Sequence, residues 1–382
     1  MRRNEISLAV VLFFALFMMT GCVISPRRTL GGTATPTPTP TATPTPTVVP
    51  TATPTPTPAT PSNRLYVSNQ DTNAIVRFNN GLTATGNIAP SGTIQGTLTT
   101  LDIPQYIALD SVHDRLFVAN FGTSPALGTV LIFDSASTLS GNVPPTRTIG
   151  GGPVSGLVSP SDVAYDATHD TLYILDVTDI LVYDTVSSAT VNGDVAPDRD
   201  ISVPFNLNAI FVDVTHDRLY AADAATNSIQ IFDNLSAIPT GVSSASRTLG
   251  GAATKLSSPI GLTLDPSNNL VVSNAGGSGS ITVYSAASVA TGTGPLNVAP
   301  IATITGAATT LATPAQIILN TVSTGAEMIV ADSAAGDVAT FTNVASSGVN
   351  PTPTRHIVGA ATTLTLTGQP TARGVALDTH AR

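Results

Sequence analysis

The chain reads Ile107-Ala108-Leu109-Asp110, then Ser111-Val112-His113-Asp114, then Arg115-Leu116-Phe117-Val118-Ala119-Asn120. This stretch predicts a β-hairpin, because an apolar strand ending in Asp meets a polar turn and a second strand of apolar and aromatic residues. The first strand recurs at Tyr106 to Asp110, Asp162 to Asp166, Ala209 to Asp213, Gly261 to Asp265, Gln316 to Asn320 and Gly374 to Asp378. The second recurs at Arg64 to Ser68, Arg115 to Ala119, Thr171 to Leu175, Arg218 to Ala222, Asn269 to Ser273 and Glu327 to Ala331.

Two more strands follow each hairpin. The third ends in an aromatic residue, as in Val130 to Phe133, and the fourth comes after a Pro-containing loop, as in Arg147 to Gly150. A four-stranded sheet of this kind cannot bury both of its faces until neighbouring sheets pack against it. The repeat therefore predicts an all-β fold, a six-bladed β-propeller of four-stranded antiparallel blades over residues 62–382.

The two ends of the repeat complete one blade. The first copy has no inner strand and starts at Arg64, whereas the strand from Gly374 to Asp378 has no partner after it. We expect the C-terminal strand to join the N-terminal blade and close the ring, because closure removes the exposed edges of an open sheet.

A first strand ending in Leu-Asp, a second reading Leu-Tyr-Val-Ala-Asn and an aromatic end to the third strand resemble the NHL and YVTN families of repeat propellers. The resemblance covers residues 62–382 and marks a fold rather than a chemistry. It implies a binding scaffold or surface protein, or, as in related six-bladed propellers, a metal-dependent lactonase or esterase.

The chain begins with a leader. Residues 1–21 hold Arg2, Arg3 and a short apolar run, which predicts an export signal. The run ends Met-Thr-Gly before Cys22, which resembles a bacterial lipobox and implies a lipoprotein signal peptide with lipidation at Cys22. Val23 after this cysteine implies the outer membrane or the cell surface. An uncleaved anchor or an ordinary secretory signal with a stray Cys is the alternative.

Residues 22–61 form a Thr/Pro-rich linker. Repeated Pro removes backbone donors, so we expect an extended polyproline II segment that reaches up to about 90 Å. It is either an O-glycosylated stalk or a plain tether. Beyond it, residues 62–382 hold no Cys and carry 11 of the 15 basic and 23 of the 24 acidic residues, a net charge of −12. This charge disfavours nucleic acid and anionic lipid as partners.

Polar residues recur where the second strand of each blade ends. They are Asn69, Asn120, Asp176, Asp223, Asn274 and Asp332. Such a ring could hold a divalent cation through oxygen ligands, but its recurrence in all six blades favours Asx turns that stabilise the fold. The same argument favours turn-stabilising hydrogen bonds for His113, His169, His216 and His380, which recur in the turn after the first strand.

Residues that break the repeat are better candidates for ligand binding. At the start of the inner strands these are Tyr106, Asp162, Asn208, Gln316 and Arg373. Below them, Ala108, Ala164, Phe211, Thr263, Ile318 and Ala376 predict a narrow, mainly apolar channel. The loop from Ile201 to Asn208 is shorter than its counterparts, which suggests a notch edged by Phe205, Asn208 and Asp223.

These observations favour a non-catalytic, surface-tethered scaffold that binds a protein or glycan in the bacterial cell envelope. No cofactor is expected. The alternative is a metal-dependent hydrolase of lactones or esters, with a divalent cation held by Asp162, Asn208 or Asp223.

Overall fold

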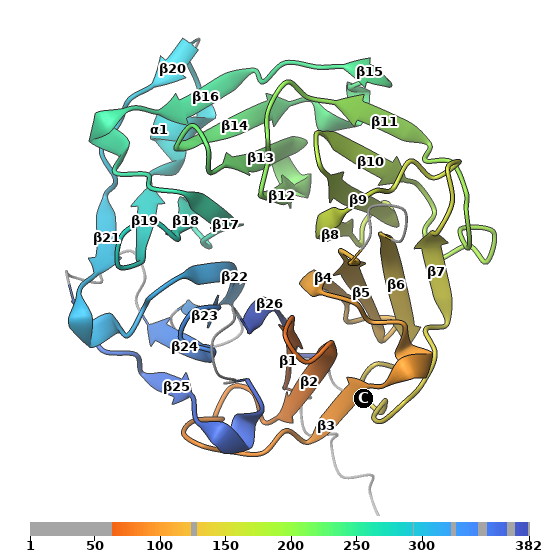
Figure 1. Ribbon diagram of the computed structural model, residues 1–382. Helices are drawn as coiled ribbons and strands as arrows, with labels where there is room; N and C mark the ends of the chain where they lie inside the picture. The colour runs from red at the N-terminus through yellow and green to blue at the C-terminus, as the bar shows by residue number, and fades with distance from the viewer. Residues whose placement is uncertain are drawn as a thin grey trace, which may run out of the picture. The chain divides into compact units, whose positions relative to one another are not determined.

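The computed structural model describes residues 63–123, 128–292, 294–321, 326–342, 350–364 and 371–380. In these residues six small sheets stand around a common axis (Figure 1). The arrangement is a six-bladed β-propeller and confirms the fold predicted from the repeat. The leader, Cys22 and the Thr/Pro-rich linker lie outside the described residues, so what we expect of them stays a prediction.

Each blade has four antiparallel strands, which follow one another from the axis outward. Blade 1 consists of β26 (Ala372–Asp378), β1 (Arg64–Asn69), β2 (Ala74–Asn79) and β3 (Gly92–Gln95). Blade 2 consists of β4 (Pro104–Asp110), β5 (Arg115–Asn120), β6 (Thr129–Asp134) and β7 (Arg147–Gly150). Blade 3 consists of β8 (Pro160–Asp166), β9 (Thr171–Asp176), β10 (Asp179–Tyr183) and β11 (Arg199–Ser202).

The other three blades follow the same plan. Blade 4 consists of β12 (Ala209–Asp213), β13 (Arg218–Asp223), β14 (Ser228–Asp233) and β16 (Arg247–Gly250). Blade 5 consists of β17 (Pro259–Leu264), β18 (Leu270–Asn274), β19 (Ser280–Tyr284) and β21 (Ala302–Thr305). Blade 6 consists of β22 (Pro314–Asn320), β23 (Glu327–Asp332), β24 (Asp337–Thr342) and β25 (Arg355–Ile357).

Four inner strands start two residues earlier than the sequence predicts, at a proline. Pro104, Pro160, Pro259 and Pro314 hold this position. Proline lacks an N–H and is therefore tolerated at the first residue of a strand. A register shift follows each of these prolines, so the pairing with the second strand is irregular there. Because of this irregularity, the first two residues of these strands do not follow the alternation of apolar and polar residues, and the alternation predicts a later start.

The ring closes as expected. Strand β26 pairs antiparallel with β1, and Arg64 lies opposite Asp378 in the register. The Arg64 guanidinium also donates to the Asp378 carboxylate at 3.3 Å. The last strand of the chain is thus the inner strand of the first blade, and blade 1 is held together by residues from both ends of the domain.

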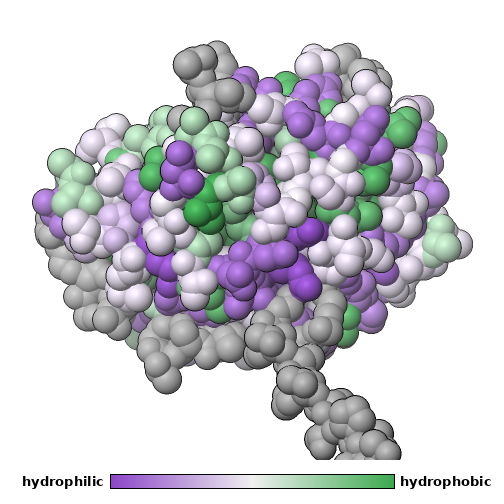
Figure 2. Space-filling view, turned by 90° about the horizontal axis from the view of Figure 1, so that it is seen from below, coloured by the Kyte–Doolittle hydropathy of each residue, from purple (hydrophilic) through white to green (hydrophobic). Residues whose placement is uncertain are grey.

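The core is divided among the blade interfaces. Six clusters of buried apolar residues each join two neighbouring blades, and together they complete the circle. On the side that Figure 2 shows, hydrophilic and weakly polar residues predominate, with apolar residues in small groups among them. Among the described residues, no helix is both long and apolar enough to cross a membrane.

Among the described residues, the outer edge of five blades pairs with the loop between the third and fourth strands of the next blade. In blades 3 and 4 this contact adds a short parallel strand, β15 (Gly241–Val242) beside β11 and β20 (Gly294–Leu296) beside β16. Single parallel bridges do the same at Gly86, Gly141 and Gly193. The sequence did not predict this pairing, which protects edge strands that would otherwise be free to pair with other chains.

The same loops carry a side chain that locks neighbouring blades together, which we call the latch residue. Its carboxamide or carboxylate oxygen accepts an N–H from the short turn after the fourth strand of the preceding blade, at 2.6 to 2.9 Å. The latch residues are Asn87, Asn142, Asp194, Asn297 and Asn350. The turns they meet include η1 (Thr97–Thr99), η5 (Ala252–Thr254), η6 (Ala307–Thr309) and η8 (Ala360–Thr362).

The junction of blades 3 and 4 has no latch residue among the described residues. It is held instead by β15 and by the Ser243 N–H, which donates to the Ser202 carbonyl at 2.8 Å. This is also the junction where the loop from Ile201 to Asn208 is short.

The latch gives a test of the junctions. Asn297→Ala removes the acceptor for the Ala253 N–H, which lies 2.9 Å from the Asn297 Oδ1. We expect the free energy of unfolding to fall by about 1 kcal/mol. Asn297→Asp should keep most of the stability, because Asp194 fills the same role at another junction. Urea unfolding of the three proteins measures the difference, and equal losses in both variants would contradict a latch based on an accepted hydrogen bond.

Candidate functional site

Four of the predicted ligand-binding residues meet at one end of the ring axis, where the inner strands begin. We call Tyr106, Asp162, Gln316 and Arg373 the axis plug; each comes from a different blade. The Tyr106 hydroxyl crosses from blade 2 to blade 5 and donates to the Ile260 carbonyl at 2.6 Å. The Arg373 guanidinium stands 5.6 Å from the centroid of the Tyr106 ring and donates to the side chain of Gln105.

Gln316 joins three blades. Its Nε2 donates to the Ile107 carbonyl at 3.0 Å in blade 2, and its Oε1 accepts the Val375 N–H at 2.8 Å in blade 1. A primary amide offers two donors and two acceptor lone pairs, and in Gln316 main-chain groups take up both ends. Gln316 therefore serves to hold the inner strands together.

Asp162 is fully enclosed at the same end of the axis. One carboxylate oxygen accepts the N–H of Val163 at 2.7 Å, and the other accepts the N–H of Ile210 in blade 4 at 2.8 Å. Burial raises the pKa of Asp162 to about 8, although these two hydrogen bonds act in the opposite direction. The carboxyl group is thus a neutral or partly charged link between blades 3 and 4 near neutral pH.

Below the plug lies a cavity of about 400 Å³. It is lined by all six of the residues predicted for the middle of the channel, Ala108, Ala164, Phe211, Thr263, Ile318 and Ala376. The lining continues to Asn320, Thr321 and Thr379, where the inner strands end. The lining thus reaches the face opposite the plug, and most of the lining side chains are apolar, as expected from the sequence.

Two close contacts bring the inner strands together around the plug. A Cβ at Gly261 would stand 2.2 Å from the Ala315 carbonyl oxygen, so no larger residue fits there. Beside it, the Ser273 hydroxyl reaches the same carbonyl at 2.6 Å. Close main-chain contact of this kind makes the plug end of the axis rigid.

The predicted notch residues lie between blades 3 and 4 but do not line the channel cavity. Phe205 is half-buried and packs on the apolar cluster shared by these blades. Asn208 is exposed, and its Oδ1 accepts the Ala224 N–H at 3.1 Å. Asp223 is buried and accepts the N–H groups of Ala225 and Thr226. The structure brings Asn208 close to Asp223 through this turn, apart from the axis plug.

The repeated polar residues are used by the fold. Asn120 and Asp176 accept N–H groups of the loop that enters their own blade. The same holds for Asn274 and Asp332, whereas Asn69 and Asp223 accept N–H groups of the turn that follows them. The bonds of Asn69 and Asp223, and a further bond from the Ala335 N–H to Asp332, are the Asx turns that the repeat predicts. Asn120, Asp176 and Asn274 instead stabilise the entering loop, which the sequence did not predict.

The repeated histidines have local partners as well. Nδ1 of His113, His169 and His216 lies 2.6 to 2.7 Å from the carboxylate of the Asp three residues earlier. The main-chain N–H of His380 donates to Asp378 at 3.0 Å. The hydrogen bond that His169 donates to Asp166 raises the pKa of His169 above its usual range. These bonds fit the prediction that the histidines stabilise turns.

A second cavity, of about 440 Å³, opens between blades 3 and 4 on the face where the inner strands end, and we call it the seam cleft. Blade 3 contributes Thr171, Tyr173, Asp184 and Arg199, and blade 4 contributes Val212 and Leu235 among others. The cleft was not predicted from the sequence, and the notch residues do not line it. The sequence held a partial signal, because the second strand starts with Arg in blades 1, 2 and 4 but with Thr171 in blade 3, Leu270 in blade 5 and Glu327 in blade 6.

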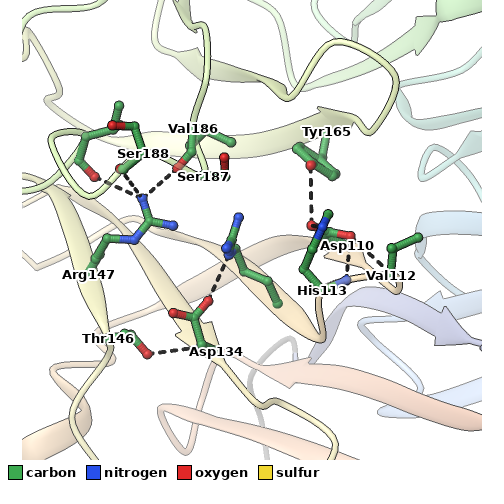
Figure 3. Close-up of polar contacts among 12 residues, drawn as sticks. Asp110, Val112, His113, Asp134, Thr146, Arg147, Tyr165, Val186, Ser187 and Ser188 are labelled. Carbon is green, nitrogen blue, oxygen red and sulfur yellow. Dashed lines mark hydrogen bonds and ion pairs between the residues drawn. The ribbon is translucent and has the colours of Figure 1, made fainter. Parts of the chain in front are cut away.

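The equivalent place between blades 2 and 3 is filled (Figure 3). There Arg115 pairs with Asp134 at 2.8 Å, and the Tyr165 hydroxyl reaches Asp110 at 3.3 Å. Arg147 crosses to the carbonyls of Val186 and Ser188, as Figure 3 shows. Thr171 occupies the place of Arg115, since each lies opposite the last Asp of the inner strand.

Val212 in turn occupies the place of Tyr165, because each precedes the last Asp of its inner strand. Two large side chains are therefore replaced by small ones at the junction of blades 3 and 4. The junction of blades 4 and 5 is again filled, by Arg218 and Arg247 on Asp233.

No protein-family model matches this chain, and no curated protein matches it either. Among solved structures, a chain in the crystal structure of the nidogen/laminin complex is similar in fold, with a TM-score of 0.51 and 16% identity, covering 83% of this chain and 98% of that one. At this identity the likeness shows the propeller fold alone.

Two further structures are more distant. A functionally unknown protein from Desulfotomaculum acetoxidans has a TM-score of 0.47 at 15% identity, covering 74% of this chain and 75% of that chain. The β-propeller domain of Cps50 (Swd1) from Myceliophteria thermophila has a TM-score of 0.42 at 13% identity, covering 65% of this chain and 67% of that chain. Since no family model matches, the NHL and YVTN resemblance stays a prediction.

Asp162 predicts how stability depends on pH. The folded state keeps a proton between the usual pKa of 3.8 and the raised value of about 8, whereas the unfolded state releases it. This group therefore makes stability fall as pH rises through that window, by at most about 1.4 kcal/mol per pH unit. Asp162→Asn removes the titration. Denaturant unfolding from pH 5 to 8 should show the variant losing less stability than the unmodified chain, and parallel curves would contradict a raised pKa.

Proposed function

We propose that this chain is a lipid-anchored, non-catalytic binding scaffold, displayed on the bacterial cell envelope, that binds a protein or glycan partner. Cys22 would carry the lipid, and residues 22–61 would hold the propeller away from the membrane. The seam cleft carries this proposal, because it is an open, mixed polar and apolar cavity within the usual size range of ligand sites. At the two neighbouring junctions, Arg115 and Arg218 form ion pairs at the equivalent place.

The side chains of the axis plug already make hydrogen bonds within the protein, which supports a non-catalytic role. Each residue of the axis plug is bonded to another blade, so these side chains hold the ring together. A scaffold gains from this arrangement, since a rigid ring positions the loops and seams that meet a partner.

The rival proposal, a metal-dependent hydrolase, would use Asp162, Asn208 or Asp223 as oxygen ligands. Their oxygens already accept main-chain N–H groups at 2.7 to 3.1 Å, and a hard cation would have to displace these donors. Among the described residues, no group of three or more His, Cys, Asp or Glu is close enough to hold a metal ion. No specific observation favours the hydrolase.

The scaffold proposal is tested with the purified full chain carrying Cys22→Ser, which keeps the linker and removes the site of lipidation. We expect saturable sedimentation with envelope fragments of the source bacterium. Protease treatment of the fragments distinguishes a protein partner, which would be lost, from a glycan, which would remain. Absence of saturable binding to both preparations would overturn the proposal.

Metal analysis of the same protein separates the two functions. After dialysis without chelator, elemental mass spectrometry should find far less than one divalent ion per chain. A stoichiometric ion that is lost in Asp162→Ala would instead support the hydrolase.

A further inference from the structure

The seam cleft keeps the hydrogen-bond acceptors of the filled junction but lacks two of its donors. At the filled junction Arg115 pairs with Asp134, and the Tyr165 hydroxyl contacts Asp110 and Asp170. The carboxylates at the equivalent places in the cleft are Asp184, Asp166 and Asp217. Because Thr171 and Val212 stand where Arg and Tyr would be, these acceptors face a cavity.

The cleft also has donors of its own. The Thr171 hydroxyl donates to Asp184 at 3.0 Å, and the Arg199 guanidinium donates to the Leu235 carbonyl at 2.9 Å. Burial raises the pKa of Tyr173, and the charge of Arg199 acts in the opposite direction. The Arg199 guanidinium is therefore close to the Tyr173 hydroxyl. Val212 and Leu235 add an apolar wall. A ligand for this cleft must therefore both donate and accept, and must have an apolar face.

Charge narrows the class of ligand further. Two of the four lining carboxylates are paired with histidines, Asp166 with His169 and Asp213 with His216. Asp217 accepts the N–H and hydroxyl of Ser236 at 2.8 and 2.7 Å. Asp184 remains with Arg199 as the nearby cation. An anion would meet these four carboxylates and is disfavoured. The carboxylates would attract a cation, but each already accepts a hydrogen bond from a side chain or the main chain of the protein, so we take an uncharged, hydrogen-bonding ligand as the class to test.

We propose that the seam cleft binds a neutral carbohydrate unit. Sugar hydroxyls both donate and accept hydrogen bonds. A sugar hydroxyl can therefore donate to Asp184, where the Thr171 hydroxyl makes only one of the bonds that an Arg side chain would make. The C–H face of a sugar ring fits the apolar wall. This inference rests on the proposed scaffold function and narrows its partner from protein or glycan to glycan.

The test uses the full chain with Cys22→Ser and isothermal titration with neutral disaccharides, namely cellobiose, maltose, lactose and chitobiose. Galacturonate and spermidine serve as anionic and cationic probes. We expect saturable binding of at least one neutral disaccharide and of neither charged probe. Binding of a charged probe alone, or of none of the probes, would overturn the proposal.

A double variant locates the binding. Thr171→Arg with Val212→Tyr rebuilds the filled junction, because Asp184, Asp166 and Asp217 are present to receive the new donors. It should keep or raise the midpoint of thermal unfolding and lower affinity on the order of ten-fold or more. Unchanged affinity in this folded variant would show that the sugar binds elsewhere and would overturn the assignment to the cleft.

Single variants provide a second readout. Asp184→Ala removes the exposed carboxylate that accepts the Thr171 hydroxyl and should weaken disaccharide binding on the order of ten-fold. Asp71→Ala is the matched control, since it removes the same charge from an exposed turn on the opposite face. Equal effects of the two changes would contradict a specific contact. Retained envelope binding by the double variant would leave the scaffold function intact while the cleft proposal fails.

Discussion

The burial of each blade against its two neighbours is the constraint on which this propeller depends. A four-stranded sheet with two apolar faces must cover both, and six blades can do so only if the ring is complete. The six apolar clusters lie at these contacts, and β26 completes the last one by pairing with β1. Closure also explains why a chain of this length forms one propeller domain, since its core is divided among six interfaces.

The same constraint determines what the polar residues do. Inner strands from six blades converge at the axis, where their unpaired polar groups would be costly to bury. Tyr106, Asp162 and Gln316 resolve this by bonding to main-chain groups of other blades. At the rim, the latch residues and the parallel pairing cover the outer edges. Most polar side chains that the repeat offers are therefore structural, and room for a ligand arises where the packing departs from the repeat.

Local pattern explains which features could be predicted from the sequence. Three signals are local: the alternation of each strand, the polar residue that ends each inner strand, and the unpaired strands at the two ends. They suffice to predict the six blades, the closure of the ring and the residues that line the channel. The role of Tyr106 could not be predicted, because its partner Ile260 lies 154 residues away in another blade. Asn297 and its counterparts were missed for the same reason. Phe205 and Asn208 were predicted as notch residues because the loop from Ile201 to Asn208 is short. The length of a loop does not specify whether a cavity forms beside it.

The junction of blades 3 and 4 departs from the repeat in three ways at once. It lacks a latch among the described residues, its entering loop is short, and Thr171 stands where blades 1, 2 and 4 have an Arg. The missing latch removes a hydrogen bond that five other junctions have, and the small side chain of Thr171 gives up contacts that an Arg makes elsewhere. Strand β15 and the bond from Ser243 to Ser202 compensate at the outer edge, away from the cleft. The outer edge of this junction is therefore paired, while the cleft beside Thr171 and Val212 stays open.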